Sequence, residues 1–274
     1  MQLWILSECK RILSIITLRF DKMDKNFETN KELLERLIHR TEDVEFATNN
    51  AQQGITVSFY KRLMSSAKAI LSLTGDAYNG CILTSHMLEA LIQLVWLLDR
   101  EERIKQYIDF GVIEQLEGLH LHPEKKEQIL KIIKEKDIQR LLQKDFLDKK
   151  ITDKILLKPE NYYKFWYKPE ANGLSAMVDK LTKDGKHQEI NNLNHLYHRF
   201  CSYKHCSPYV MLPRYAKTIP VEELPDAFLA VTAAFQCLYI CCLLVNKYQH
   251  TPIDIKDITS DYEKVLGIKW VQAE

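Results

Sequence analysis

The sequence predicts an all-α fold, and three observations support this prediction. Apolar residues recur at spacings of three and four along most of the chain, which is the period of an amphipathic helix. The 274 residues include only eight glycines and eight prolines, too few for a fold rich in strands and tight turns. Hydrophobic residues make up 46% of the chain, which is enough to form a sizeable helical core.

Two helices are expected at the N-terminus. Residues 1–25 form an amphipathic pattern, and no positive charge precedes its apolar part, so it does not resemble a signal peptide. The next helix is expected over residues 29–48. Thr29 is suited to be its N-cap, and Glu32 three residues later completes a capping box.

The third and fourth helices are expected over residues 56–73 and 77–99, with Gly54 breaking the chain before the third. The fourth is apolar nearly all round, as in a central helix. Its polar residues fall within an arc of about 80°, so they form either the solvent-facing side of the helix or a polar seam lining a cleft. They are Asn79, His86, Glu89, Gln93 and Arg100.

The middle of the chain is more charged. An amphipathic helix is expected over residues 100–117, a second begins at Pro123, and residues 137–158 form one or two short helices. Residues 120–158 together are predicted to be a charged insertion or lid.

The next stretch, residues 161–169, reads NYYKFWYKP and combines five aromatic rings with two lysines. Lys164 and Trp166 are candidates to hold and stack the bases of a single strand. The alternative is an aromatic plug that covers the core.

Three further helices complete the chain. A short helix is expected over residues 173–183, a longer one over 188–204, and a long apolar helix over 221–248, followed by a weak helix at 261–266. The prolines in residues 208–213 predict an extended segment there. The predicted organisation is therefore N-terminal helices over residues 1–54, a main helical domain over 55–250 that contains the charged insertion, and a tail over 251–274.

Composition excludes several classes of protein. The net charge of +1 means that any contact with nucleic acid is local. The seven cysteines have no paired spacing, which favours a reducing, cytoplasmic setting. We interpret the most apolar segment, 228–245, as a buried helix and not a membrane span. No glycine-rich phosphate loop, nucleophile elbow or zinc-protease motif is present, and we expect no cofactor.

The stretch from Tyr197 to His205, YHRFCSYKH, contains the strongest candidate site. Arg199 offers a forked cation suited to phosphate, and His205 can exchange a proton near neutral pH. These are the groups that RNA cleavage needs without a metal. A metal site is disfavoured because His198 and His205 would lie about 10 Å apart along a helix. A structural role for the cluster remains the alternative.

The spacing of Arg199 and His205 resembles the R-x(4–6)-H motif of HEPN domains, many of which are metal-independent ribonucleases. The chain, over about residues 55–248, also resembles a bacterial helical family of unknown function with the motifs R-x-x-x-E and Y-R-x-x-S-x-x-x-H. Glu89, Tyr197 and His205 match these motifs. The positions that depart from them are Ser85 and His198, where arginines are expected, and Cys201, where a serine is expected.

The resemblance implies a HEPN-like helical bundle that cleaves RNA, acting as a toxin or antiviral defence effector and forming a homodimer. His205 would be the general acid or base, and Arg199 would bind the scissile phosphate. The remaining candidates are Glu89, Tyr197 and His198 as catalytic residues, and His86, Tyr203 and Lys204 as substrate-binding residues. The alternative is a non-catalytic helical subunit of a defence or regulatory complex.

Overall fold

The computed structural model describes residues 27–73, 76–147, 149–183, 189–207, 225–249 and 253–266. These residues form helices and turns with no strand, apart from an isolated bridge between Leu142 and Tyr162. The predicted all-α class is therefore confirmed. The helix expected over residues 1–25 and the extended segment expected at 208–213 lie outside the described residues.

The chain divides into two compact units, one made of residues 1–94 and 178–274 and the other of residues 95–177. α5 (Ala77–Asp99) and α10 (Leu174–Thr182) each run from one unit into the other. The other helices of the first unit are α3 (Phe27–Thr41), α4 (Ala51–Ser72), α11 (Glu189–Lys204), α13 (Pro225–Tyr248) and α14 (Lys256–Leu266).

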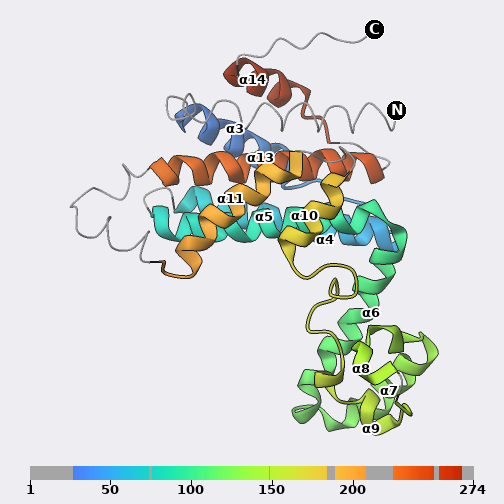
Figure 1. The fold of residues 1–274 in the computed structure, drawn as a ribbon. Helices are drawn as coiled ribbons and strands as arrows, with labels where there is room; N and C mark the ends of the chain where they lie inside the picture. Colours follow the sequence, from blue (N-terminus) through green and yellow to red (C-terminus); the bar gives the residue numbers. More distant parts are fainter. Residues whose placement is uncertain are drawn as a thin grey trace. The chain divides into compact units, whose positions relative to one another are not determined.

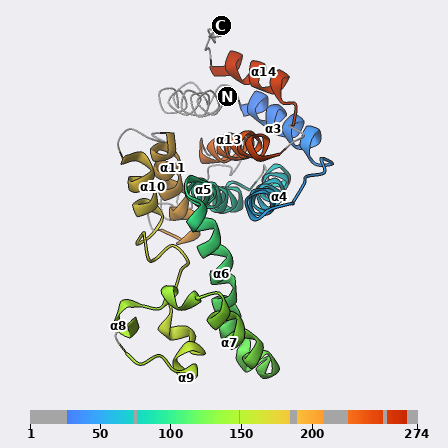
Figure 2. The same ribbon diagram turned by 90° about the vertical axis from the view of Figure 1, so that its right-hand side faces the viewer.

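α13 is the central helix of the first unit. It packs most extensively against α4 and α3, and Figures 1 and 2 show it with α3 and α14 on one side and α4 on the other. Each of residues 229–242 is at most 7% exposed. The helix is apolar all round because other helices of the same chain cover it on every side.

The N-terminal boundaries differ from those predicted. α3 begins at Phe27, so Thr29 lies inside the helix and does not cap it, and the helix ends at Thr41 instead of residue 48. The carbonyl of Thr41 accepts a hydrogen bond of 2.8 Å from the Tyr60 hydroxyl, so a tertiary contact satisfies this helix end. The predicted break at Gly54 is wrong, because Gly54 lies in the first turn of α4.

The start of α4 is set by Asn50, whose side chain accepts a hydrogen bond of 2.9 Å from the backbone N–H of Gln53. This is an N-cap of the common kind. The predicted limits of α5, residues 77–99, are confirmed. The C-terminal helix is longer than expected, since α14 begins at Lys256 and not at residue 261.

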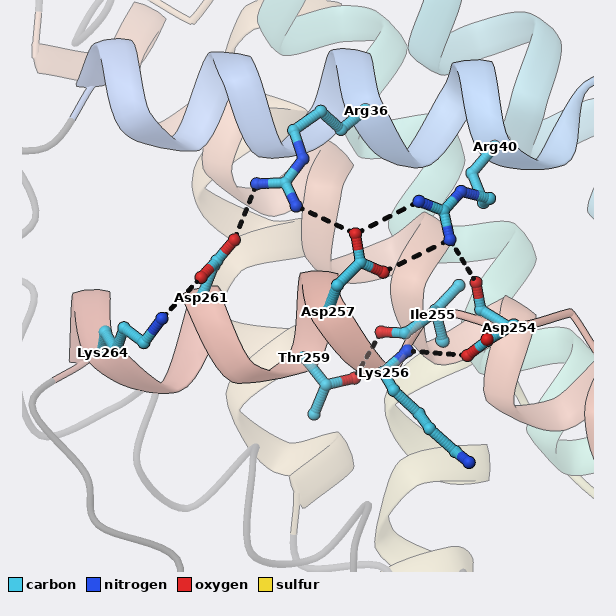
Figure 3. Close-up of polar contacts among 9 residues, drawn as sticks. All are labelled: Arg36, Arg40, Asp254, Ile255, Lys256, Asp257, Thr259, Asp261 and Lys264. Atoms are coloured by element: carbon cyan, nitrogen blue, oxygen red, sulfur yellow. Dashed lines mark hydrogen bonds and ion pairs between the residues drawn. The ribbon is translucent and has the colours of Figure 1, made fainter.

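α14 is attached to α13 by a buried face and to α3 by charge. Tyr262 accepts a hydrogen bond of 3.0 Å from Gln236 and packs edge-on against Phe235 at 4.8 Å. On the outer side, α3 and α14 are joined by a row of ion pairs (Figure 3). These are Arg36–Asp261 at 2.8 Å, Arg36–Asp257 at 3.1 Å and Arg40–Asp257 at 3.2 Å.

Two helices of the described chain, Ala77–Asp99 and Phe228–Tyr248, are long and apolar enough to cross a membrane. In their most apolar windows, 61% and 83% of the residues are buried inside the protein. Their apolar character is accounted for by packing within the chain, and the segment 228–245 is a buried helix as predicted.

The second unit contains α6 (Glu101–Glu117), α7 (Lys126–Glu135), α8 (Lys144–Leu147) and α9 (Asp153–Leu156). Its buried centre includes Arg103, whose side chain is 3% exposed. The guanidinium lies 3.3 Å from the centre of the Trp96 ring and pairs with Asp99 at 2.8 Å and Glu170 at 3.0 Å. Two carboxylates and an aromatic face thus compensate for burying this charge.

Candidate functional site at the end of α11

The end of α11 has a defined geometry. The N–H of Ser207 donates to the carbonyl of Ser202 at 2.9 Å, and the N–H of Cys206 donates to that of Tyr203 at 3.2 Å. Cys206 has a φ of 48°. Together these features form a Schellman motif with Cys206 in the left-handed position that glycine usually occupies. His205 is therefore the last residue before the reversal, and its side chain is exposed.

A buried carboxylate fixes Arg199. Asp226, in the first turn of α13, has a side chain that is 3% exposed. Its Oδ1 accepts hydrogen bonds from Nε of Arg199 at 3.0 Å and from Nη2 at 2.5 Å, and its Oδ2 accepts one from the Tyr203 hydroxyl. The N-terminus of α13 also favours a negative charge at this position. The guanidinium is thus held in one orientation by a carboxylate that is itself fixed.

Arg199 remains accessible while it is held. Its side chain is 52% exposed, and the two hydrogen bonds to Asp226 engage two of the five N–H donors of a guanidinium. A ligand can reach the remaining donors from solvent. A guanidinium in this state is suited to bind an oxyanion such as phosphate with little loss of side-chain entropy.

Arg199 and His205 are not brought together within one chain. Six residues of helix separate their Cα atoms by about 9 Å along the axis and by about 120° around it. Among the described residues, no hydrogen bond joins the two side chains. The guanidinium is directed to Asp226 on α13, whereas the imidazole lies at the exposed end of α11.

The polar stripe of α5 is partly buried. His86, Glu89 and Gln93 are half-buried, Asn79 is exposed, and Gln93 donates to Glu89 at 3.2 Å. The stripe is thus neither fully exposed to solvent nor fully buried. Arg100 lies just beyond α5, is exposed, and belongs to the second unit.

His86 has cationic neighbours on two other helices. Burial lowers the pKa of His86, the positive charges of Lys204 on α11 and Arg62 on α4 lower it further, and Glu89 opposes the shift. These neighbours and the burial thus favour the neutral form of the imidazole. The predicted substrate-binding residues His86 and Lys204 thus lie within electrostatic range of one another.

The aromatic residues of α11 are mostly packed. Tyr203 is 2% exposed, packs edge-on against Tyr78 at 6.1 Å, and donates its hydroxyl to Asp226. It was expected to contact substrate, but its ring is buried in the core. Tyr197 is half-buried and packs against the exposed His198 ring at 5.5 Å.

The start of α5 contacts the end of α11 directly. The Tyr78 hydroxyl lies 3.1 Å from Sγ of Cys206.

Over the described ranges, no group of three or more metal-ligating side chains occurs.

In the second unit, the two predicted RNA-stacking residues have different environments. Lys164 is exposed, whereas Trp166 is 6% exposed and packs edge-on against Tyr107 at 5.3 Å. The Trp166 ring belongs to the interior of the unit, which fits the aromatic-plug alternative for this residue.

Sequence reasoning missed two residues of the site. Asp226 is an acidic residue in the first turn of a helix, and this local signal indicates only a favourable helix end. Arg62 lies on an otherwise ordinary polar face of α4. Their partners Arg199 and His86 are distant in sequence, so only helix packing reveals these pairs.

Comparison with known proteins identifies one family. The profile of a family described as a family of unknown function, DUF5677, matches residues 53–218, which is more than half of the chain. The match includes His86, Glu89, Arg199 and His205, and it ends before Asp226. No curated protein and no solved structure matches the chain.

Proposed function

The chain belongs to DUF5677, a family of unknown function, and we propose that this member is a metal-independent endoribonuclease of the HEPN type. We further propose a cytoplasmic toxin or antiviral defence effector as its setting. The observation that carries the proposal is the end of α11, where an exposed imidazole follows an accessible guanidinium that a buried carboxylate holds in place.

The proposed reaction is an intramolecular transfer within RNA. A base removes the proton of a 2′-hydroxyl, and the 2′-oxygen attacks the adjacent phosphorus. The bond from phosphorus to the 5′-oxygen then breaks, and an acid returns a proton to that oxygen. The products are a 2′,3′-cyclic phosphate and a 5′-hydroxyl end. His205 is the general acid or base in this reaction, and Glu89 or His86 orients its imidazole. Arg199 and Tyr197 donate hydrogen bonds to the charged phosphorane oxygens.

The separation of Arg199 from His205 within one chain favours a site shared by two copies. A two-fold axis next to α11 would bring Arg199 of one subunit near His205 of the other. The apolar surface of α13 is already buried within its own chain, so it does not provide a dimer contact. We propose the exposed side of α11, which includes His195 and His198, as the contact surface.

The first experiment measures RNA cleavage in excess EDTA and identifies the ends of the products. We expect the wild type to release 2′,3′-cyclic phosphate, and His205→Ala to lose at least about 100-fold in rate because one acid–base group is removed. His39→Ala is the matched control, since His39 is an exposed histidine of α3 and has no part in the proposed site or dimer contact. Full activity of His205→Ala, or an inactive wild type, would contradict the proposal.

A mixing experiment tests the shared site. Arg199→Ala and His205→Ala are each expected to be inactive alone. If each site takes Arg199 from one subunit and His205 from the other, a re-equilibrated equal mixture contains one intact site in half of its dimers and regains about a quarter of the wild-type activity. No recovery would place both residues of a site in the same chain.

One observation favours a second candidate function, a non-catalytic interaction subunit. The positive charge of Arg199 is matched by Asp226, as in an ion pair that only supports packing. Under this alternative, the wild type cuts no RNA in the EDTA assay.

A further inference from the structure

The aromatic segment 161–169 of the second unit alternates between core and surface. Tyr162 and Trp166 are 1% and 6% exposed, whereas Phe165 is 41% exposed. Two backbone hydrogen bonds of 3.1 Å attach the segment to the turn at residues 141–143. Phe165 is therefore presented at the surface by a segment that two buried rings and the main chain hold in place.

A neighbouring ring fixes the orientation of Phe165. Its ring stacks parallel to that of Tyr167, with centroids 5.4 Å apart and 3° between the planes. Tyr167 in turn meets Trp166 edge-on at 5.4 Å. Because the ring is already ordered, a planar ligand that stacks on it loses less of its binding free energy to side-chain ordering.

A cation lies over this ring. Nζ of Lys164 is 5.4 Å from the centre of the Phe165 ring, and the lysine is exposed. Within the described part of the second unit, none of the ion pairs involves Lys164.

We propose that Phe165 stacks on an unpaired nucleobase of RNA and that Lys164 binds a phosphate next to that base. A ring that is 41% exposed and has a cation 5.4 Å from its centre matches the two chemical parts of a single-stranded nucleotide. The other exposed large hydrophobic residues among those described are Ile108, Leu121 and Leu147, and none of them has a flat ring. The inference takes RNA as the ligand from the proposed function and adds a preference for single strands.

The test is binding of a fluorescein-labelled 12-nucleotide single-stranded RNA, measured by anisotropy in EDTA. The protein is the full chain with His205→Ala, so that the RNA stays intact. Phe165→Ala is expected to weaken binding by about 5- to 150-fold, the value of one base stack. Phe165→Trp should retain binding, and Phe165→Leu, which keeps an apolar side chain without a ring, should lose it.

Three comparisons separate stacking from other effects. Leu121→Ala removes a hydrophobic side chain that is 68% exposed in the same unit and should leave binding unchanged. Lys164→Gln should lower the slope of log K against log salt by about 0.7, the contribution of one phosphate contact on a single strand. A 12-base-pair RNA duplex should bind weakly, since its bases are already stacked and paired.

Three results would overturn the inference: no binding of the single strand, equal affinity of wild type and Phe165→Ala, or equal binding of the duplex. If Phe165→Ala does not fold, the comparison of Phe165→Leu with Phe165→Trp decides. The two proposals fail separately. If Phe165→Ala leaves RNA cleavage unchanged, the nuclease proposal is retained and the stacking proposal is rejected. If the wild type cleaves no RNA but binds it through Phe165, the stacking proposal is retained and the nuclease proposal is rejected.

Discussion

Replacing Arg199 by alanine tests whether the buried carboxylate of Asp226 depends on it. The variant removes two hydrogen bonds to Oδ1 and retains the one that the Tyr203 hydroxyl donates to Oδ2. Asp226 is 3% exposed, so solvent can replace the lost donors only through the space that Arg199 leaves. We therefore expect Arg199→Ala to lower the free energy of unfolding.

The magnitude lies between two limits. Breaking a fully buried ion pair costs about 3–5 kcal/mol, whereas leaving one hydrogen-bonding group unsatisfied costs about 1–3 kcal/mol. The Arg199 side chain is 52% exposed, so water can enter the space that it leaves and recover part of the loss. We expect a decrease of about 2 kcal/mol, which corresponds to a fall in Tm of about 4–8 °C.

Circular dichroism and hydrogen exchange are the suitable assays. Both tryptophans among the described residues, Trp96 and Trp166, lie in the second unit, so their fluorescence reports on the wrong part of the chain. Exchange of the amides of α11 and α13 should accelerate in the variant. Arg100→Ala is the control, because Arg100 is 62% exposed and lies 3.7 Å from Asp99, and its loss should cost at most about 1 kcal/mol.

A double-mutant cycle with Asp226→Asn completes the test. If the pair acts as described, the coupling energy is about 1–2 kcal/mol, since neighbouring residues of one network are not additive. A loss below about 0.5 kcal/mol in Arg199→Ala, with no coupling, would refute the reasoning. Arg199 would then be an ordinary surface residue.

Two further predictions concern the helix ends. Cys206→Gly should stabilise the protein by about 0.5–1 kcal/mol because the φ of 48° suits glycine. Cys201→Gly, inside α11, should destabilise it by about 1 kcal/mol. Urea titration measures both changes. Acid should detach α14 from α3. Hydrogen bonds from Lys264 and Arg36 lower the pKa of Asp261, so their stabilisation is complete above the unfolded pKa of about 4 and is lost as pH falls through the lower folded pKa. Pepsin at pH 3 should therefore cleave wild-type α14 before α4, and equal cleavage rates would contradict this.

Local sequence signals predicted the helices well where one face or all faces are apolar. The limits of α5 follow from an unbroken apolar run that ends at charged residues, and α6 follows it directly. The prediction failed at the end of α3, where a hydrogen bond from Tyr60 to Thr41 satisfies the helix end. A contact between residues 19 positions apart leaves no mark in the local pattern.

For the candidate site, too, the sequence predicted some features and not others. The sequence alone identified Arg199 and His205 by residue type and spacing, but it did not reveal the Asp226 carboxylate 27 residues later. It also identified the aromatic segment at 161–169 without indicating that Trp166 is buried and Phe165 exposed.

By itself, then, the sequence determined the helical class, most helix limits and the chemical groups of the candidate site, because these depend on residues within a turn or two of each other. Only the tertiary structure decided which of those groups are buried and which carboxylate holds the arginine. Those outcomes depend on how helices far apart in the chain pack together, and no local pattern encodes that packing.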